Sequence, residues 1–116
     1  MTDKPKELSL EDIIQLANRI GLEFADRRQQ AERLELMRTP VRSKIMNELA
    51  QGDPKASESR LKRLAEGSDA YVSLLEEIVV ARAEAERLRI RYESYRSLFE
   101  ARRTLMSYKK AELWAL

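Results

Sequence analysis

Apolar side chains recur at alternating steps of three and four residues through the second half of the chain. This spacing keeps side chains on one face of an α-helix. After the Gly67–Asp69 junction, no glycine or proline interrupts the pattern before about Leu113. The pattern predicts one long helix with an apolar face, which we call the seam stripe: Tyr71, Leu74, Ile78, Ala81, Ala85, Leu88, Tyr92, Tyr95 and Phe99.

The seam stripe has a seven-residue period, which is typical of left-handed, coiled-coil-like packing. A helix of about 45 residues would be about 65 Å long, whereas a compact domain of this size is only about 27 Å across. We therefore expect the helix to project or to pair with other copies, with the seam stripe as the interface of a homo-oligomer. Arg102 and Lys109 stand where apolar residues would continue the stripe, so we expect looser packing beyond Phe99.

Capping signals divide the first half of the chain into shorter helices. Ser9 with Asp12 predicts a helix start, and the apolar spacing carries this helix to about Met37. Gly21 within it indicates a close contact with another helix. The remaining signals are a cap at Thr39 before Pro40, a loop at Gln51–Lys55, a further helix opened by Ser57, and a cap at Ser68 that starts the long helix.

The fold class expected from these elements is all-α, because no segment alternates apolar and polar residues for long. We expect a helical hairpin or bundle with one long C-terminal helix, in a coiled-coil-like oligomer. The chain divides into a flexible tail (1–8), a short-helix region (9–67) and a long amphipathic helix (68–116).

Composition excludes several kinds of chemistry. The 116 residues include no cysteine and no histidine, so disulfides, thiolate metal sites and the commonest general base are absent. The sequence has no glycine-rich phosphate loop and no nucleophile beside a base, and among the clustered glutamates only Glu77 and Glu84 share a face. We expect a non-enzymatic protein without cofactor or metal. No apolar run approaches the roughly 20 residues that span a bilayer, and we expect a cytoplasmic protein that does not contact membranes.

A charge ladder accompanies the seam stripe: Arg82, Glu86, Arg89, Glu93, Arg96, Glu100 and Arg103. Opposite charges at this spacing stabilise their own helix by about 0.2–0.5 kcal/mol per pair. One interpretation of the ladder is therefore a solvated face that satisfies its own charges.

The cations of the C-terminal part outnumber its acids. Residues 1–81 hold 13 Lys/Arg against 15 Asp/Glu, whereas residues 82–116 hold 9 against 5. Tyr92, Tyr95 and Tyr108 are interleaved with these cations, and cations beside aromatic rings are the components of single-strand nucleic-acid binding. Ordinary surface charge is the alternative. The candidate nucleic-acid-binding residues are Arg87, Arg89, Arg91, Arg96, Arg102, Arg103, Lys109 and Lys110.

Residues 68–97 resemble phage recombination mediators of the UvsY type. The segment opens with Tyr71 in a Tyr-x-x-Leu-Leu run and later reads Arg89-Ile90-Arg91-Tyr92, followed by Tyr95. The family has a similar opening and a basic-x-basic pair closely followed by tyrosines. Its tyrosine pair precedes a glycine-containing turn, whereas Arg96–Phe99 continues the helix here.

The resemblance implies a small, helical, ring-forming protein encoded by a phage and acting in the host cytoplasm. Its role would be to help a RecA-like recombinase replace single-strand-binding protein on single-stranded DNA, and Arg89 and Arg91 would help to hold that DNA.

A second hypothesis is a helical scaffold or chaperone-like adaptor whose long helix binds another protein, with arginines meeting carboxylates. The sequence leaves open the oligomer number, the choice between DNA and RNA, and the role of Trp114.

Overall fold

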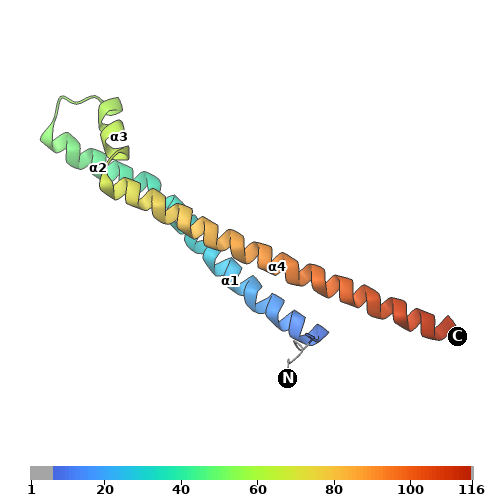
Figure 1. Ribbon diagram of the computed structural model, residues 1–116. Helices are drawn as coiled ribbons and strands as arrows, with labels where there is room; N and C mark the ends of the chain where they lie inside the picture. The colour runs from blue at the N-terminus through green and yellow to red at the C-terminus, as the bar shows by residue number, and fades with distance from the viewer. Residues whose placement is uncertain (1–6, 116) are drawn as a thin grey trace, which may run out of the picture. The chain divides into compact units, whose positions relative to one another are not determined.

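Helices account for nearly all of residues 7–115, the part of the chain that the computed structural model describes. They are α1 (Leu10–Leu36), α2 (Arg38–Gly52), α3 (Glu58–Glu66) and α4 (Asp69–Ala115) (Figure 1). The all-α prediction with one long C-terminal helix is confirmed. The tail predicted for residues 1–8 lies mostly outside the described residues.

Three of the predicted caps are present. The Asp12 N–H donates to Ser9 Oγ at 3.1 Å, and the Ser9 N–H donates back to the Asp12 carboxylate at 3.3 Å. Ser57 and Ser68 each accept a hydrogen bond from the N–H three residues ahead, at 3.2 and 3.3 Å. These bonds satisfy backbone donors that have no partner within their helix, which fixes where α1, α3 and α4 begin.

The predicted cap at Thr39 is wrong, because α2 already begins at Arg38 and Thr39 lies inside its first turn. A proline ring in a helix meets the carbonyl four residues earlier, and for Pro40 this residue is Leu36, the last residue of α1. The break therefore falls at Met37. Pro40 is tolerated in the first turn of α2, where its missing N–H would have no helical partner.

The loop predicted at Gln51–Lys55 starts two residues later than expected. Helix α2 continues through Gly52, and the Asp53 N–H donates to the Leu49 carbonyl at 3.0 Å. The backbone of Asp53 then turns to φ −144° and ψ 80°. A residue that precedes proline is pushed out of the helical region, so Pro54 ends the helix at this point.

The chain forms two compact units, one built from two segments distant in sequence and the other from a single continuous segment. Unit 1 holds the residues up to Ala25 together with those from Glu86 onward, and unit 2 is Asp26–Ala85. The division does not follow the sequence boundary expected near residue 68, because antiparallel pairing of α1 with α4 joins opposite parts of the chain within each unit.

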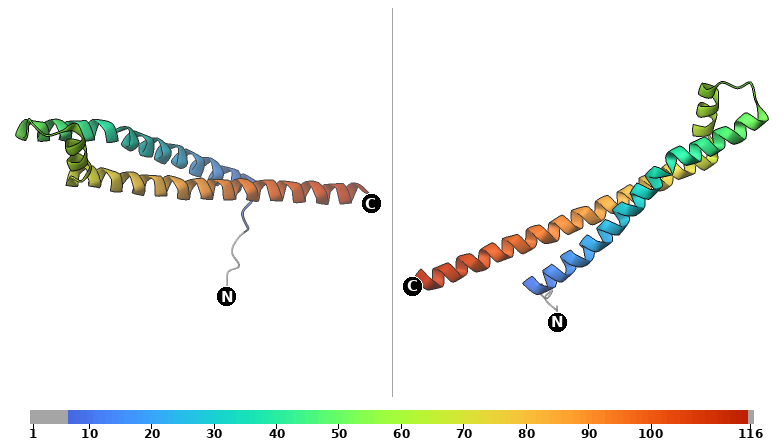
Figure 2. Two further views of the ribbon diagram at one scale, coloured as in Figure 1. Left: turned by 90° about the horizontal axis from the view of Figure 1, so that it is seen from above. Right: turned by 180° about the vertical axis from the view of Figure 1, so that it is seen from behind.

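In unit 2, the end of α1 lies beside the start of α4. Arg27 pairs with Glu84 at 3.4 Å, and Arg82 pairs with Glu35. Helices α2 and α3 pack together, and α3 connects the region of α2 to the start of α4 (Figure 2).

The first part of the seam stripe is packed within unit 2. Its five buried residues share this unit with buried Ala31 of α1 and Ala65 of α3. The five are Tyr71, Leu74, Ile78, Ala81 and Ala85, with exposed fractions between 3% and 7%. A single chain therefore already removes these five side chains from solvent. The sequence pattern indicated a packing partner without showing that α1 supplies it.

The core of unit 1 is smaller and more open. Ile13, Ala17 and Ile20 of α1 are buried, whereas the later seam-stripe residues of α4 are only partly covered. These later residues are Leu88, Tyr92, Tyr95 and Phe99. The packing of the seam stripe thus loosens from Leu88 onward, earlier than the position beyond Phe99 at which the sequence predicted it.

Gly21 marks a close approach between α1 and α4 in unit 1. A Cβ atom built on Gly21 would lie 3.0 Å from Cε2 and 3.2 Å from Cδ2 of the Tyr92 ring. The ring of Tyr92 therefore occupies the space that a larger residue at position 21 would fill. This confirms the predicted close helix contact.

We predict that Gly21→Ala stabilises the protein less than its helix propensity alone would. Alanine favours a helix by about 1 kcal/mol over glycine, but here the new methyl group crowds the Tyr92 ring. In a Tyr92→Ala background the full gain of about 1 kcal/mol should appear. Urea unfolding followed by circular dichroism would measure this coupling in a double-mutant cycle.

Gly52→Ala is the matched control, because nothing lies within 4 Å of a Cβ at Gly52. Its effect should be the same with and without Tyr92. An equal gain from Gly21→Ala in both backgrounds would contradict the proposed crowding.

Candidate nucleic-acid interface

All eight candidate cations lie on the part of α4 that belongs to unit 1, but they occupy different sides of the helix. A seven-residue step keeps positions on one flank. This groups Arg89, Arg96, Arg103 and Lys110 on the ladder flank. Arg102 and Lys109 lie in the line of the seam stripe, and Arg87 and Arg91 lie on the opposite flank. The eight residues therefore do not form one continuous surface.

Arg89 is held by the ladder itself. Its Nε donates to Glu86 Oε2 at 3.0 Å and its Nη1 donates to Glu93 Oε1 at 2.8 Å, while Nη2 donates to the second oxygen of Glu86. The hydrogen bond from Arg89 lowers the pKa of Glu86, and the two carboxylates raise the pKa of Arg89. A phosphate would have to displace these carboxylates to bind Arg89.

Arg96 and Tyr92 are also engaged within the protein. The Arg96 guanidinium lies 5.8 Å from the centre of the Tyr92 ring, within the range of a cation–π interaction. Tyr92 packs toward Gly21, and Tyr95 is half-buried as well. Of the three tyrosines considered for base stacking, only Tyr108 is widely exposed.

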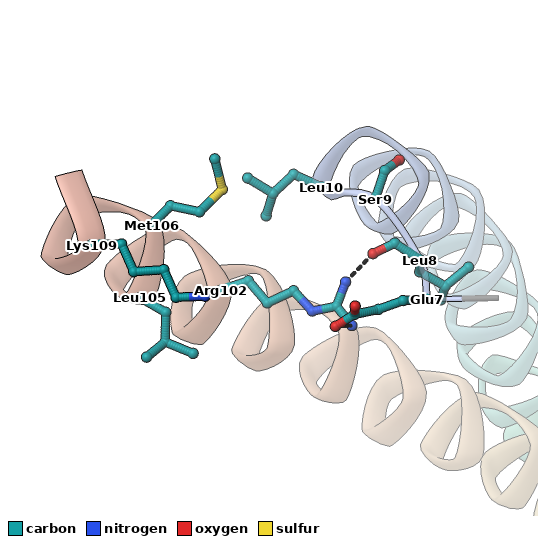
Figure 3. Close-up of a pocket in the computed structure, with 8 residues that line it drawn as sticks. All are labelled: Glu7, Leu8, Ser9, Leu10, Arg102, Leu105, Met106 and Lys109. Atoms are coloured by element: carbon teal, nitrogen blue, oxygen red, sulfur yellow. Dashed lines mark hydrogen bonds and ion pairs between the residues drawn. The ribbon is translucent and has the colours of Figure 1, made fainter. Parts of the chain in front are cut away.

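Arg102 connects the two sequence segments that form unit 1. Its guanidinium donates to the Leu8 carbonyl and pairs with Glu7 at 3.4 Å (Figure 3). These residues line a pocket between the start of α1 and the C-terminal part of α4, and Figure 3 shows Leu10 and Met106 facing one another across it. Arginine at this seam position thus fastens the segment preceding α1, a role that the sequence did not predict because the contact joins residues 94 positions apart.

Five candidate cations have no carboxylate partner in the described part of the chain. Arg87, Arg91, Arg103, Lys109 and Lys110 are exposed, and none of them forms an ion pair with another described residue. Three of the five lie between residues 103 and 110. An anion can reach these side chains without breaking an ion pair.

No group of three potential metal-ligating side chains occurs within residues 7–115. Among the same residues, no helix combines the length and the apolar content that crossing a membrane requires. Comparisons with models of protein families, with curated proteins and with solved structures gave no match to this chain.

We predict that the Glu86 carboxyl titrates below its ordinary range and returns toward it in Arg89→Gln. Because the folded-state pKa is lowered, the stabilisation by this pair is present above the unfolded-state pKa. It is lost as the pH falls through the lowered pKa. Carboxyl carbon chemical shifts followed by NMR against pH would measure the change.

Arg91→Gln is the control, because it removes a nearby cation that does not pair with Glu86. An unchanged Glu86 titration in Arg89→Gln would show that the two side chains are not paired in solution.

Proposed function

We propose that this protein is a non-enzymatic helical protein that binds single-stranded DNA through the C-terminal part of α4. The observation that carries the proposal is the group of exposed cations without carboxylate partners at Arg103, Lys109 and Lys110. The earlier cations of the ladder flank are weaker candidates, since Arg89 holds two carboxylates and Arg96 lies over a tyrosine ring. Arg87 and Arg91 would extend the contact along a second flank.

The proposed contact is electrostatic and independent of sequence. Cations that neutralise phosphates release the counterions condensed on the nucleic acid, so affinity falls as salt rises. The arginines also suit phosphate because their planar donors bind two oxygens at once.

We predict that the triple variant Arg103→Glu, Lys109→Glu and Lys110→Glu binds a labelled single-stranded oligonucleotide at least about tenfold more weakly at low salt. Losing three phosphate contacts should also reduce the slope of log affinity against log salt by about 2. Fluorescence anisotropy over a series of salt concentrations would measure both quantities, and circular dichroism would verify that the helix content is retained.

The matched control reverses three exposed lysines of unit 2, Lys44→Glu, Lys55→Glu and Lys62→Glu. Both triple variants change the net charge equally. Equal losses of affinity in the two triple variants would show that only net charge matters. Undiminished binding by the variant at Arg103, Lys109 and Lys110 would contradict the proposed site.

We further propose that the protein assembles into a homo-oligomer, which would multiply weak phosphate contacts through avidity. The buried first part of the seam stripe is occupied within one chain, so the interface is proposed on exposed apolar side chains of α4. Ile90, Leu105 and Met106 are each more than half exposed. Sedimentation equilibrium over a range of protein concentrations should show a mass that exceeds that of the monomer. A monomer mass at every concentration would contradict this part of the proposal.

The resemblance to phage recombination mediators extends the proposal to a place in recombination. In this role the protein would act in the host cytoplasm and load a RecA-like recombinase on DNA covered by single-strand-binding protein. A labelled single-strand-binding protein would then leave its oligonucleotide faster when this protein accompanies the recombinase. An unchanged displacement rate would confine the proposal to DNA binding.

A helical adaptor that binds another protein is the second candidate function. Leu105, Met106 and Leu113 are exposed on the same end of α4 that carries the unpaired cations, and such a surface suits an acidic amphipathic helix. Absence of single-strand binding at low salt would favour this function over the first.

A further inference from the structure

The charge ladder changes character at its C-terminal end. Its acids, Glu86, Glu93 and Glu100, are spaced by seven residues, and the next two positions in that series are Ser107 and Trp114. Since α4 continues unbroken to Ala115, a seven-residue step keeps these positions on the flank that carries the ladder. A tryptophan therefore stands at a position where the repeat would place a carboxylate.

Because Ser107 and Trp114 stand where the series would place acids, the surroundings of Arg103 and Lys110 differ from those of Arg89. Arg89 has carboxylates one turn before and one turn after it, and both accept hydrogen bonds from it. Arg103 and Lys110 instead have Ser107 and Trp114 four residues ahead. Neither cation forms an ion pair with another residue of the described chain. This end of the ladder is thus positively charged and open to an external anion.

Trp114 combines the largest aromatic surface of the chain with high exposure. It is the only tryptophan, and 81% of it is accessible to solvent. Lys110 lies one helical turn before it and Arg103 a further two turns back, about 10 Å along the axis. Exposed aromatic rings beside cations bind single-stranded nucleic acid, because bases stack on the ring while the cations contact phosphates.

We propose that Trp114 stacks on an unpaired base while Lys110 and Arg103 contact phosphates of the same strand. This inference rests on the proposed function and adds the ligand preference of the site. A base is available for stacking in a single strand and is covered by its neighbours in a duplex. Trp114 thereby gives the site a preference for single-stranded over double-stranded nucleic acid.

The single tryptophan also provides the test. Its fluorescence in the full-length protein should be quenched by an oligothymidylate and should change little with inorganic polyphosphate of equal charge, which has no bases. Trp114→Leu should weaken oligothymidylate binding about tenfold, because stacking contributes about 1–3 kcal/mol per base. Polyphosphate binding should be unaffected by this variant, and Trp114→Phe should restore part of the oligothymidylate affinity.

Leu113→Ala is the matched control, because Leu113 is also exposed at this end of α4 but does not belong to the seven-residue series. Its oligothymidylate affinity should equal that of the unsubstituted protein. Equal losses in Trp114→Leu and Leu113→Ala would indicate a general apolar contact and overturn the stacking. Duplex that quenches and binds as well as the single strand would overturn the preference.

Two further outcomes separate this inference from the proposed function. Oligothymidylate binding by anisotropy with no quenching, and with full affinity in Trp114→Leu, would overturn the stacking and leave the proposed function standing. No binding of oligothymidylate or polyphosphate at low salt would overturn the proposed function and the inference with it.

Discussion

The packing of the apolar stripe of α4 against α1 determines what the rest of the surface can do. A helix of this length exposes a large apolar area unless a second helix covers one face of it. In unit 2 that cover is nearly complete, since five residues of the stripe are buried. In unit 1 Ile13, Ala17 and Ile20 of α1 are buried, but the facing stripe of α4 is only partly covered. Gly21 permits this contact because it leaves space for the Tyr92 ring.

This packing also separates the cations of α4 into those with a structural partner and those without one. Arg102 lies in the line of the seam, where it reaches the Leu8 carbonyl and Glu7. Arg89 is one flank away, and its neighbours on the same helix supply two carboxylates. Beyond Glu100 the flank has no further acid. The cations available to an anion are thus concentrated where the intramolecular partners end.

Local features of the fold could be predicted from the sequence, whereas the partners of long-range contacts could not. The caps at Ser9, Ser57 and Ser68 depend on hydrogen bonds across three residues, so the sequence contains both partners. The predicted cap at Thr39 is wrong because the Pro40 ring excludes a helical Leu36 carbonyl, and Leu36 belongs to α1 and not to α2. The periodicity of the seam stripe predicted an apolar face on α4, but periodicity cannot distinguish a partner helix of the same chain from one of another copy.

The same limit applied to the candidate site. Residue type and spacing identified eight cations and allowed Arg89 to pair within the ladder. The contact of Arg96 with the Tyr92 ring and that of Arg102 with Glu7 are seen only in the structure. The remaining surface combines exposed cations with exposed apolar groups, which suits either a nucleic acid or an acidic protein. The two partners make different demands on Trp114. A protein groove would accept any large apolar residue at this end, including Leu113, whereas a base requires a flat ring beside a cation. The place of Trp114 in the series of the ladder, one turn after Lys110, meets the second demand and favours the nucleic acid.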